Sequence, residues 1–308
     1  GNHSSPFGTE NSEYIVAGTR FSVPGDNDNG DVPISSYKQN FKGHISFVSV
    51  DPTSGEMKVA FQLRTPGVNF DLARSGKGKS HGWFFFSCYN TEQANTLLEV
   101  NASQKDKDFI MAVNWKKAEE YIKAGKGKKT PVKYAHNVFD ESTQTSKSSI
   151  IDEVLVLDIA EIKDICYFIP CPKSPHGCDV DPTGEYIVGS GKLAALIPVF
   201  SFDKIQKAIG DKAYDGDYQG IPVIKYEAAL YGEVKKPGLG PLHTEFDAKG
   251  NAYTSFFVSS EIVKWNIKDL KVLDRAPTFF LFFHLCVPGG NTVKPWGKYL
   301  IAYNKITK

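Results

Sequence analysis

The sequence lacks any long hydrophobic run, and its longest apolar stretches, such as Phe279–Phe283, are only a few residues long. A helix that spans a bilayer needs about 20 apolar residues, so no membrane span is expected. An excess of one charge is also missing, because 36 Lys and Arg residues are balanced by 35 Asp and Glu residues. That balance argues against nucleic-acid binding as the main activity, since such proteins carry strongly basic surfaces.

Cysteine is scarce and unpaired, with five residues and no C-x-x-C spacing. A disulfide framework is therefore not expected, and neither is a zinc site built from four cysteines. We expect the cysteines to be small buried apolar residues. A targeting segment is missing too. Because the chain begins abruptly at Gly1 and stops abruptly at Lys308, we expect both ends to be cuts through a longer protein.

Helical periodicity is confined to Asn114–Ala124 and Phe202–Ile209, the second ended by Gly210. The Gly-interleaved basic run Lys123–Lys133 is typical of a solvated loop. The rest alternates short β-rich runs with Gly, Pro, Asn and Asp clusters, which predicts an all-β sandwich, barrel or propeller. The clearest runs are Tyr14–Ala17, Ile45–Val50, Lys58–Leu63, Trp83–Cys88, Phe109–Val113, Glu153–Asp158, Tyr186–Gly189, Ala252–Val258 and Tyr299–Tyr303.

A weak internal repeat favours the propeller. Its unit, an Asp-x-x-Gly turn followed by an alternating apolar strand, occurs at Asp181–Val188 and Asp247–Tyr253, with looser copies at Asp51–Val59 and Pro295–Ile301. Glycine supplies the positive φ of a tight hairpin, and Asp or Pro opens the turn. Self-similar hairpins tens of residues apart are typical of propeller blades. Their uneven spacing predicts insertions, of which His136–Ser149 is one.

Only seven histidines are present, and two occupy matching places in this repeat. His176 lies five residues before Asp181, and His243 lies four before Asp247, each at the start of the strand that enters the hairpin. The first strand of each propeller blade lines the central channel, so side chains at one end of these strands converge on the axis. Neutral imidazole is a common metal ligand. The pattern therefore predicts a metal centre, with copper or zinc favoured over calcium or magnesium.

Other polar residues leave alternatives open. His3 and His284 precede comparable turns and strands. Three histidines are expected to make ordinary hydrogen bonds: His44, His81 and His136. The cluster Cys88–Glu92, with Asp106 downstream, is compatible with a calcium site or with an ordinary strand-end turn. Phosphate loops, nucleophile elbows and H-E-x-x-H motifs do not occur in the sequence, and its acidic residues form no obvious acid–base pair.

Several segments resemble nitrous oxide reductase, and the similarity runs over essentially the whole chain. These segments are Ser174–Asp179, Gly238–Thr244, Asn251–Phe257, Lys264–Asn266, Cys88–Glu92 and Gly297–Lys305. Arg20–Pro24 and His284–Gly290 resemble the atypical branch of that family. The resemblance implies a seven-bladed propeller with a four-copper sulfide cluster on seven histidines, followed by a cupredoxin domain with a two-copper electron-entry site. Residues 1–308 would then be a part of the propeller, cut at both ends.

The resemblance also implies an activity and a setting. Two electrons and two protons convert N₂O to N₂ and water in a periplasmic head-to-tail homodimer, and the electron donor is a protein such as a c-type cytochrome or a cupredoxin. Carried over by position, copper ligation is implied for His3, His176, His243 and His284. Phe279–Phe283 precedes His284 where the family has Gly. Lys305 matches a lysine beside the cluster, where an ammonium group can donate a proton or stabilise developing charge.

Calcium ligation is implied by the same resemblance. The matching positions are Tyr89, Glu92, the backbone carbonyl of Val100, Asp106 and Ser174, where the better-known branch has Asn in place of Ser174. The family's adjacent His-His pair lies upstream of Gly1, its last ligand lies beyond Lys308, and the cupredoxin domain is not in this sequence. We therefore predict that these 308 residues alone neither assemble the full cluster nor reduce N₂O.

Two other functions remain open at this point. The first is a non-catalytic propeller that serves as a binding scaffold, with structural histidines. The second is a propeller hydrolase or lyase with zinc or calcium on its axis, which requires an axial carboxylate or a base that activates water.

Overall fold

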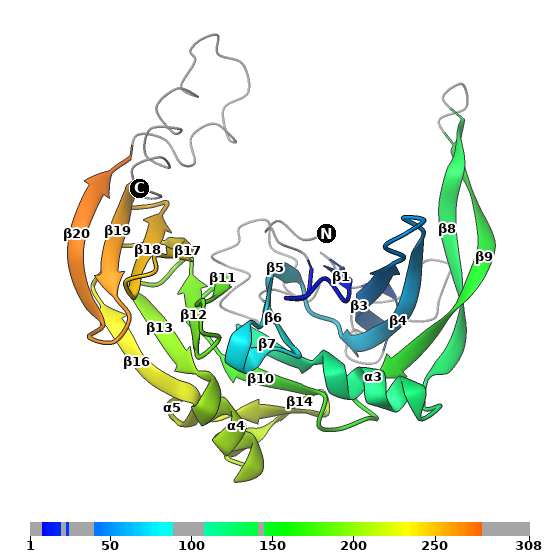
Figure 1. The fold of residues 1–308 in the computed structure, drawn as a ribbon, viewed down its shortest axis with the longest axis horizontal. Coiled ribbons are helices and arrows are strands. Elements are labelled where there is room, and N and C mark those ends of the chain that lie inside the picture. The colour runs from blue at the N-terminus through cyan, green and yellow to red at the C-terminus, as the bar shows by residue number, and fades with distance from the viewer. Residues whose placement is uncertain (1–7, 20–22, 25–39, 89–107, 141–144, 279–308) are drawn as a thin grey trace.

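The computed structural model describes all residues except 1–7, 20–22, 25–39, 89–107, 141–144 and 279–308. The described residues fold mainly into strands, which form four sheets. The sheets follow one another around an arc, and one edge strand of each sheet lies on the inner side of the arc (Figure 1). The all-β prediction is therefore confirmed, and the arrangement is compatible with a propeller.

The first two sheets have six strands each. The first has the order β1-β3-β4-β9-β8, with β2 paired to β3: β1 (Ile15–Gly18), β2 (Val23–Pro24), β3 (Phe41–Val50), β4 (Met57–Pro66), β8 (Lys128–Asp140) and β9 (Thr145–Asp158). The second has the order β5-β6-β7-β10-β15-β14: β5 (Phe70–Ser75), β6 (Trp83–Cys88), β7 (Phe109–Asn114), β10 (Cys166–Pro170), β15 (Ile221–Ile224) and β14 (Tyr214–Tyr218). In the second sheet β5, β6, β7 and β10 follow one another in chain order, and β15 and β14 are added beyond β10. In the first sheet β9 and β8 are added beyond β4.

The other two sheets have four antiparallel strands each, the pattern of a propeller blade. The third holds β11 (Pro175–Val180), β12 (Tyr186–Gly191), β13 (Leu196–Ser201) and β16 (Leu230–Lys235). The fourth holds β17 (Pro241–Phe246), β18 (Asn251–Phe256), β19 (Glu261–Asn266) and β20 (Lys271–Pro277). Strands β5, β11 and β17 lie on the inner side of the arc, and β16 and β20 lie on its outer side (Figure 1).

Hydrophobic cores lie between neighbouring sheets. All six residues of β6 are buried, and they alternate between two cores. Phe84 and Phe86 pack in the core shared with the first sheet, whereas Phe85 packs in the core shared with the third. Another core between the third and fourth sheets is built around Trp265. A strand that is covered on both faces reads as a continuous apolar run, which is why Trp83–Cys88 carries no polar alternation.

The Asp-x-x-Gly turns confirm two copies of the predicted repeat. One turn joins β11 to β12 and the other joins β17 to β18, and Gly184 and Gly250 have φ values of +75° and +80°. The copy at residues 51–55 differs, because it joins β3 to β4, the second and third strands of the first sheet. It is therefore not equivalent to the other two. The fourth copy, Pro295–Ile301, lies outside the described residues.

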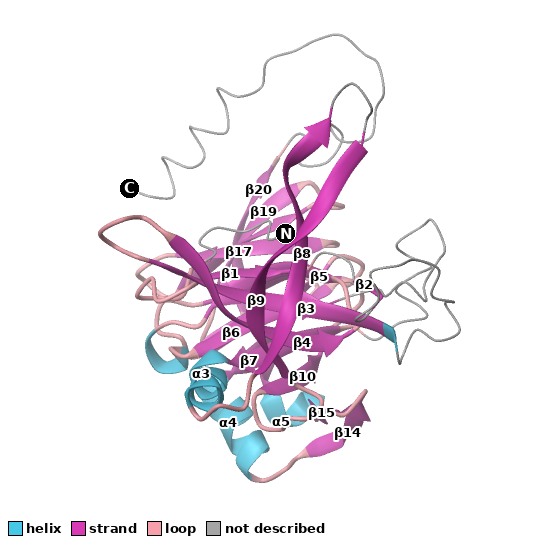
Figure 2. Ribbon diagram, turned by 90° about the vertical axis from the view of Figure 1, so that its right-hand side faces the viewer, coloured by secondary structure: helices cyan, strands magenta, loops and turns pink. Residues whose placement is uncertain are grey.

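Both predicted helices are present on the outer rim, α3 at Trp115–Lys123 and α4 at Phe202–Gly210 (Figure 2). Each begins after a capping side chain, Asn114 or Ser201, that accepts a hydrogen bond from a backbone N–H of the first turn. Two shorter helices are α5 (Tyr226–Ala229) and the 3-10 turn η2 (Gly78–Ser80). No helix in the described part of the chain is long and apolar enough to cross a bilayer.

One loop prediction is wrong in part. The basic run 123–133 ends α3 and then enters β8, which begins at Lys128. Strands β8 and β9 include the described residues of the predicted insertion, 136–140 and 145–149, and extend beyond the body of the first sheet (Figure 2). Pairing with β9 along most of β8 supplies backbone hydrogen bonds, which a lysine-rich sequence does not itself predict.

Candidate metal centre

The structure brings two of the predicted copper ligands together. His176 is the second residue of β11 and His243 is the third residue of β17, and these two inner strands lie side by side. The placement at strand starts, read from the repeat, is confirmed. The other predicted site residues except Ser174 lie outside the described residues: His3, Tyr89, Glu92, Val100, Asp106, His284 and Lys305.

Each histidine lies in a β-bulge. Between Pro175 and Gly177 the chain advances two residues on β11 for one on β12, so His176 has no partner opposite it. Between Pro241 and Thr244 the chain advances three residues on β17 for two on β18, and His243 lies within that irregular step. A bulge bends the strand and re-aims one side chain. The same device in both strands turns the two imidazoles toward each other.

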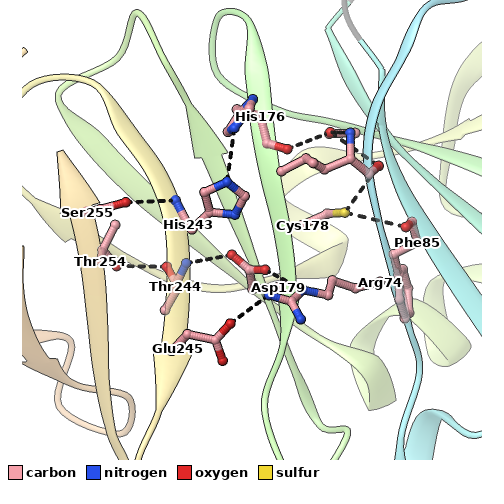
Figure 3. A network of polar contacts seen from close by, with 12 residues as sticks. Arg74, Phe85, His176, Cys178, Asp179, His243, Thr244, Glu245, Thr254 and Ser255 are labelled. Carbon is pink, nitrogen blue, oxygen red and sulfur yellow. Dashed lines mark hydrogen bonds and ion pairs between the residues drawn. The ribbon is translucent and has the colours of Figure 1, made fainter. Parts of the chain in front are cut away.

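The two imidazole rings face each other through their Nε2 atoms, which lie 3.2 Å apart (Figure 3). The ring centroids are 4.8 Å apart and the planes cross at 76°. Two nitrogens bound at about 2.0 Å to one tetrahedral metal ion lie about 3.3 Å apart. The spacing therefore fits a shared metal ion, and imidazole donors suit copper or zinc. Without a metal ion, one ring can donate its proton to the other.

A buried carboxylate fixes the orientation of His176. Asp71, on β5, accepts a hydrogen bond from Nδ1 of His176 over 2.6 Å. The ammonium of Lys192 lies 3.2 Å from the same Asp71 oxygen, so the carboxylate is paired with a cation as well. The Asp71 side chain is only 4% exposed. With the proton held on Nδ1, Nε2 carries the lone pair that a metal ion needs.

The backbone and the burial of the pair complete this geometry. Ser87, on β6, donates a hydrogen bond of 2.7 Å to the carbonyl oxygen of His176. Burial of His243 lowers the pKa of its imidazole below the ordinary value, although the negative charge of Asp179 opposes the shift. The neutral imidazole is the form that binds metal ions. Burial thus favours the neutral, metal-binding form of the His243 ring.

The remaining described candidates have other surroundings. Ser174 is fully buried with a φ of +56°, and its carbonyl oxygen accepts a hydrogen bond from the backbone N–H of Lys192. Its calcium role stays a prediction. His81 lies between two carboxylates, those of Glu10 and Glu13, at 3.0 and 3.1 Å. Four cysteines are free and lie in or beside the cores, as predicted: Cys88, Cys166, Cys171 and Cys178.

The sequence interpretation missed the charged residues around the pair. The sequence pattern points to neither Asp71 nor Lys192, and it shows no obvious acid–base pair, whereas the structure pairs Asp71 with His176. The sequence does contain a sign of a functional carboxylate, because Asp71 lies between the apolar residues Phe70 and Leu72. A carboxylate in a buried strand must be paired, but the sequence does not say with which residue.

Among the described residues, no group of three or more His, Cys, Asp or Glu side chains is placed to hold a metal ion. Two imidazoles are too few for a copper or zinc site, which needs three or four protein ligands. His176 and His243 therefore fit copper as one part of a ligand set. The donor types suit the metal, and further ligands have to come from elsewhere.

Comparison with known proteins gives this pair a context. No family model matches the chain. The chain is 29% identical over 265 residues to nitrous-oxide reductase of Pseudomonas fluorescens, and 26% identical over 314 residues to that of Stutzerimonas stutzeri. These alignments cover 84% and 96% of the chain. This chain is a partial homologue of nitrous-oxide reductase. It spans 35% and 42% of the length of these two nitrous-oxide reductases.

Solved structures add little to that relationship. Hydrazine synthase from Kuenenia stuttgartiensis is similar at a TM-score of 0.44 with 11% identity, over 84% of this chain and 57% of that one. A similarity of that size carries no conclusion about function. The sequence relationship to nitrous-oxide reductase and the histidine pair are therefore the two findings from which a function is inferred.

Proposed function

We propose that this chain is part of the β-propeller of a copper-dependent nitrous-oxide reductase, an oxidoreductase that converts N₂O to N₂ and water. The observation that carries the proposal is the pair of converging imidazoles, His176 and His243, on neighbouring inner strands. In the proposed ligand set His3 and His284 join them, and segments outside these 308 residues supply the other three histidines. In the alternative of structural histidines, the Nε2–Nε2 contact is a hydrogen bond and the pair binds no metal ion.

The described residues have distinct tasks in this proposal. Bound copper would supply the redox chemistry for N₂O reduction. Asp71 holds the His176 proton on Nδ1, so that Nε2 stays a donor toward the axis. Lys192 balances the Asp71 charge, and the burial of His243 keeps that ring neutral. The protein thus presents two oriented nitrogen donors without a rearrangement of side chains.

Further parts of the proposal rest on the resemblance. Lys305 would deliver protons near the cluster, and calcium would bind Tyr89, Glu92, Val100, Asp106 and Ser174. A cupredoxin domain with a two-copper site, in the protein from which residues 1–308 are taken, would pass electrons from a c-type cytochrome or a cupredoxin. The whole protein would be a periplasmic homodimer.

Titration of the full chain with copper(II), followed by electron paramagnetic resonance, tests the histidine pair. We expect a signal split by two histidine nitrogens, which changes to one nitrogen in His176→Ala or His243→Ala. The affinity should fall in each variant by more than the about 10- to 100-fold that the loss of a supporting group costs, because a ligand itself is removed. His81→Ala is the matched control, since His81 lies between Glu10 and Glu13 and away from the pair. An unchanged copper signal in both single variants would contradict the proposal.

A further inference from the structure

One buried arginine ties the three inner strands next to the histidine pair. Nε of Arg74, on β5, lies 2.8 Å from Oδ1 of Asp179 on β11. Another nitrogen of the same guanidinium, Nη2, lies 2.7 Å from Oε1 of Glu245 on β17 (Figure 3). The side chains of Arg74 and Asp179 are 10% and 2% exposed, whereas that of Glu245 is 71% exposed. The guanidinium thus joins three sheets from a largely buried position.

Hydrogen bonds extend from Arg74 through Asp179 to the backbone beside the histidine pair. Asp179 follows His176 by three residues on β11, and its Oδ2 accepts a hydrogen bond of 2.6 Å from the N–H of Thr244. Thr244 is the residue directly after His243. Its hydroxyl is hydrogen-bonded to Thr254, which also accepts from the indole N–H of Trp265. The Asp179 carboxylate therefore connects β11, three residues after His176, to the backbone directly after His243.

Geometry explains why an arginine occupies this place. Its planar guanidinium presents several N–H donors in a fixed fork, so two carboxylates on different strands are held at a set distance from each other. Lysine offers a single charged nitrogen on a flexible stem and cannot impose that spacing. A buried charge that loses its partner is also costly. The distance between β11 and β17 is hence tied to the Arg74 side chain.

We propose that Arg74 is a positioning residue for the His176–His243 pair, which it acts on through Asp179, Glu245 and the backbone of Thr244. The inference rests on the proposed function, because it assigns the pair a metal ion. The inferred role belongs to a residue that connects three sheets and does not contact the metal ion. Asp71 orients one ring, whereas Arg74 sets the distance between the two strands that carry the rings.

The experiment compares Arg74→Met, Arg74→Lys and the double variant Arg74→Met/Asp179→Asn in the full chain. The double variant removes both buried charges, so it stays folded where the single variant leaves Asp179 unpaired. Arg74→Lys keeps the charge without the fork. The matched control is Lys79→Met. It breaks the ion pair between Lys79 and Glu185, which joins the second and third sheets at an exposed position. Circular dichroism and thermal melting establish that each variant is folded.

Two readouts separate positioning from simple stability. In the metal-free chain, ¹⁵N-histidine NMR detects the coupling between the two Nε2 atoms across their hydrogen bond. In the copper(II) complex, electron paramagnetic resonance counts the histidine nitrogens. We expect the double variant and Arg74→Lys to lose the coupling and the two-nitrogen signal, with copper affinity about 10- to 100-fold lower, as for other supporting groups of metal sites. Lys79→Met should retain both signals.

The outcomes distinguish this inference from the proposed function. A folded double variant that keeps the coupling and the two-nitrogen signal overturns the positioning role and leaves the metal site standing. If the Arg74 variants lose the coupling while His176→Ala and His243→Ala do not alter copper binding, the positioning role is supported and the proposed metal site fails.

Discussion

Asp247 shows how much one turn residue contributes. Its carboxylate accepts hydrogen bonds from the backbone N–H groups of Lys249 and Asn251. It also accepts from the Asn251 amide and the Tyr253 hydroxyl. Burial alone would raise the pKa of Asp247, but these hydrogen bonds lower it to about 2. The ionised Asp is therefore the form that the β17–β18 turn stabilises.

The contribution of Asp247 to the free energy of unfolding depends on pH. The folded-state pKa of Asp247 lies below the unfolded value of about 3.9, so its contribution is complete above pH 4 and is lost as the pH falls toward 2. We expect Asp247→Asn to lower the free energy of unfolding at pH 7 by about 1 kcal/mol, since the site is partly exposed. The difference between the two proteins should shrink between pH 4 and 2. Urea unfolding at several pH values measures it.

The matched control is Asp269→Asn, because Asp269 is an exposed residue of the β19–β20 turn. It removes one negative charge without removing the hydrogen bonds at Asp247. If the wild-type and Asp247→Asn curves stay a constant distance apart from pH 7 to 2, the assigned contribution is wrong.

At the scale of elements, the two bulged strands are the parts that build the candidate metal centre. Gly177 directly follows His176, and a Cβ atom at this position would lie 2.2 Å from the carbonyl oxygen of Leu242. Leu242 precedes His243 on the neighbouring strand. The absence of a side chain at Gly177 therefore allows β11 and β17 to approach as closely as the histidine pair requires.

Gly177→Ala should separate the two strands. We expect a loss of about 1–3 kcal/mol in the free energy of unfolding, the usual cost of extra volume in a packed interior. Copper affinity should fall together with the two-nitrogen signal. Gly210→Ala is the matched control, because a Cβ atom there meets no heavy atom within 4 Å. A folded Gly177→Ala protein with unchanged copper binding would refute the role given to the close approach.

At the scale of the whole molecule, the described sheets form an arc and bring two of the proposed ligands together. The chain spans 35% to 42% of the length of the nitrous-oxide reductases it matches. A metal cluster that bridges several blades needs ligands from all of them, since each inner strand contributes from one direction only. The described residues thus bring two imidazoles together, which is fewer than a copper site needs.

We therefore expect the 308-residue chain, supplied with copper, sulfide and a reductant, to show no N₂O reduction. Metal analysis should find fewer than four copper ions per chain, and gas chromatography should find no conversion of N₂O to N₂. A longer protein that includes the flanking segments is the matched control. Stoichiometric four-copper loading of the 308 residues with N₂O turnover would contradict the prediction.

Local features of the fold could be predicted from the sequence. The run Trp83–Cys88 agrees with β6, and both helices begin and end within one or two residues of the predicted bounds. Alternation, capping residues and turn glycines act over a few residues, so their signal is contained in a short segment. The looser copy of the repeat at 51–55 forms a turn between β3 and β4, and which strands it joins could not be predicted, because a turn motif does not state them.

The sequence by itself determined strands such as Trp83–Cys88, the turns at Gly184 and Gly250, and the positions of His176 and His243 at matching strand starts. Only the tertiary structure decided their surroundings. Asp71 is 105 residues from His176, and Arg74 is 171 residues from Glu245. Such partners meet because sheets packed around an arc place distant inner strands side by side. A buried charge needs a partner of opposite charge or a hydrogen bond, and the packing of the sheets determines which residue lies close enough to be that partner.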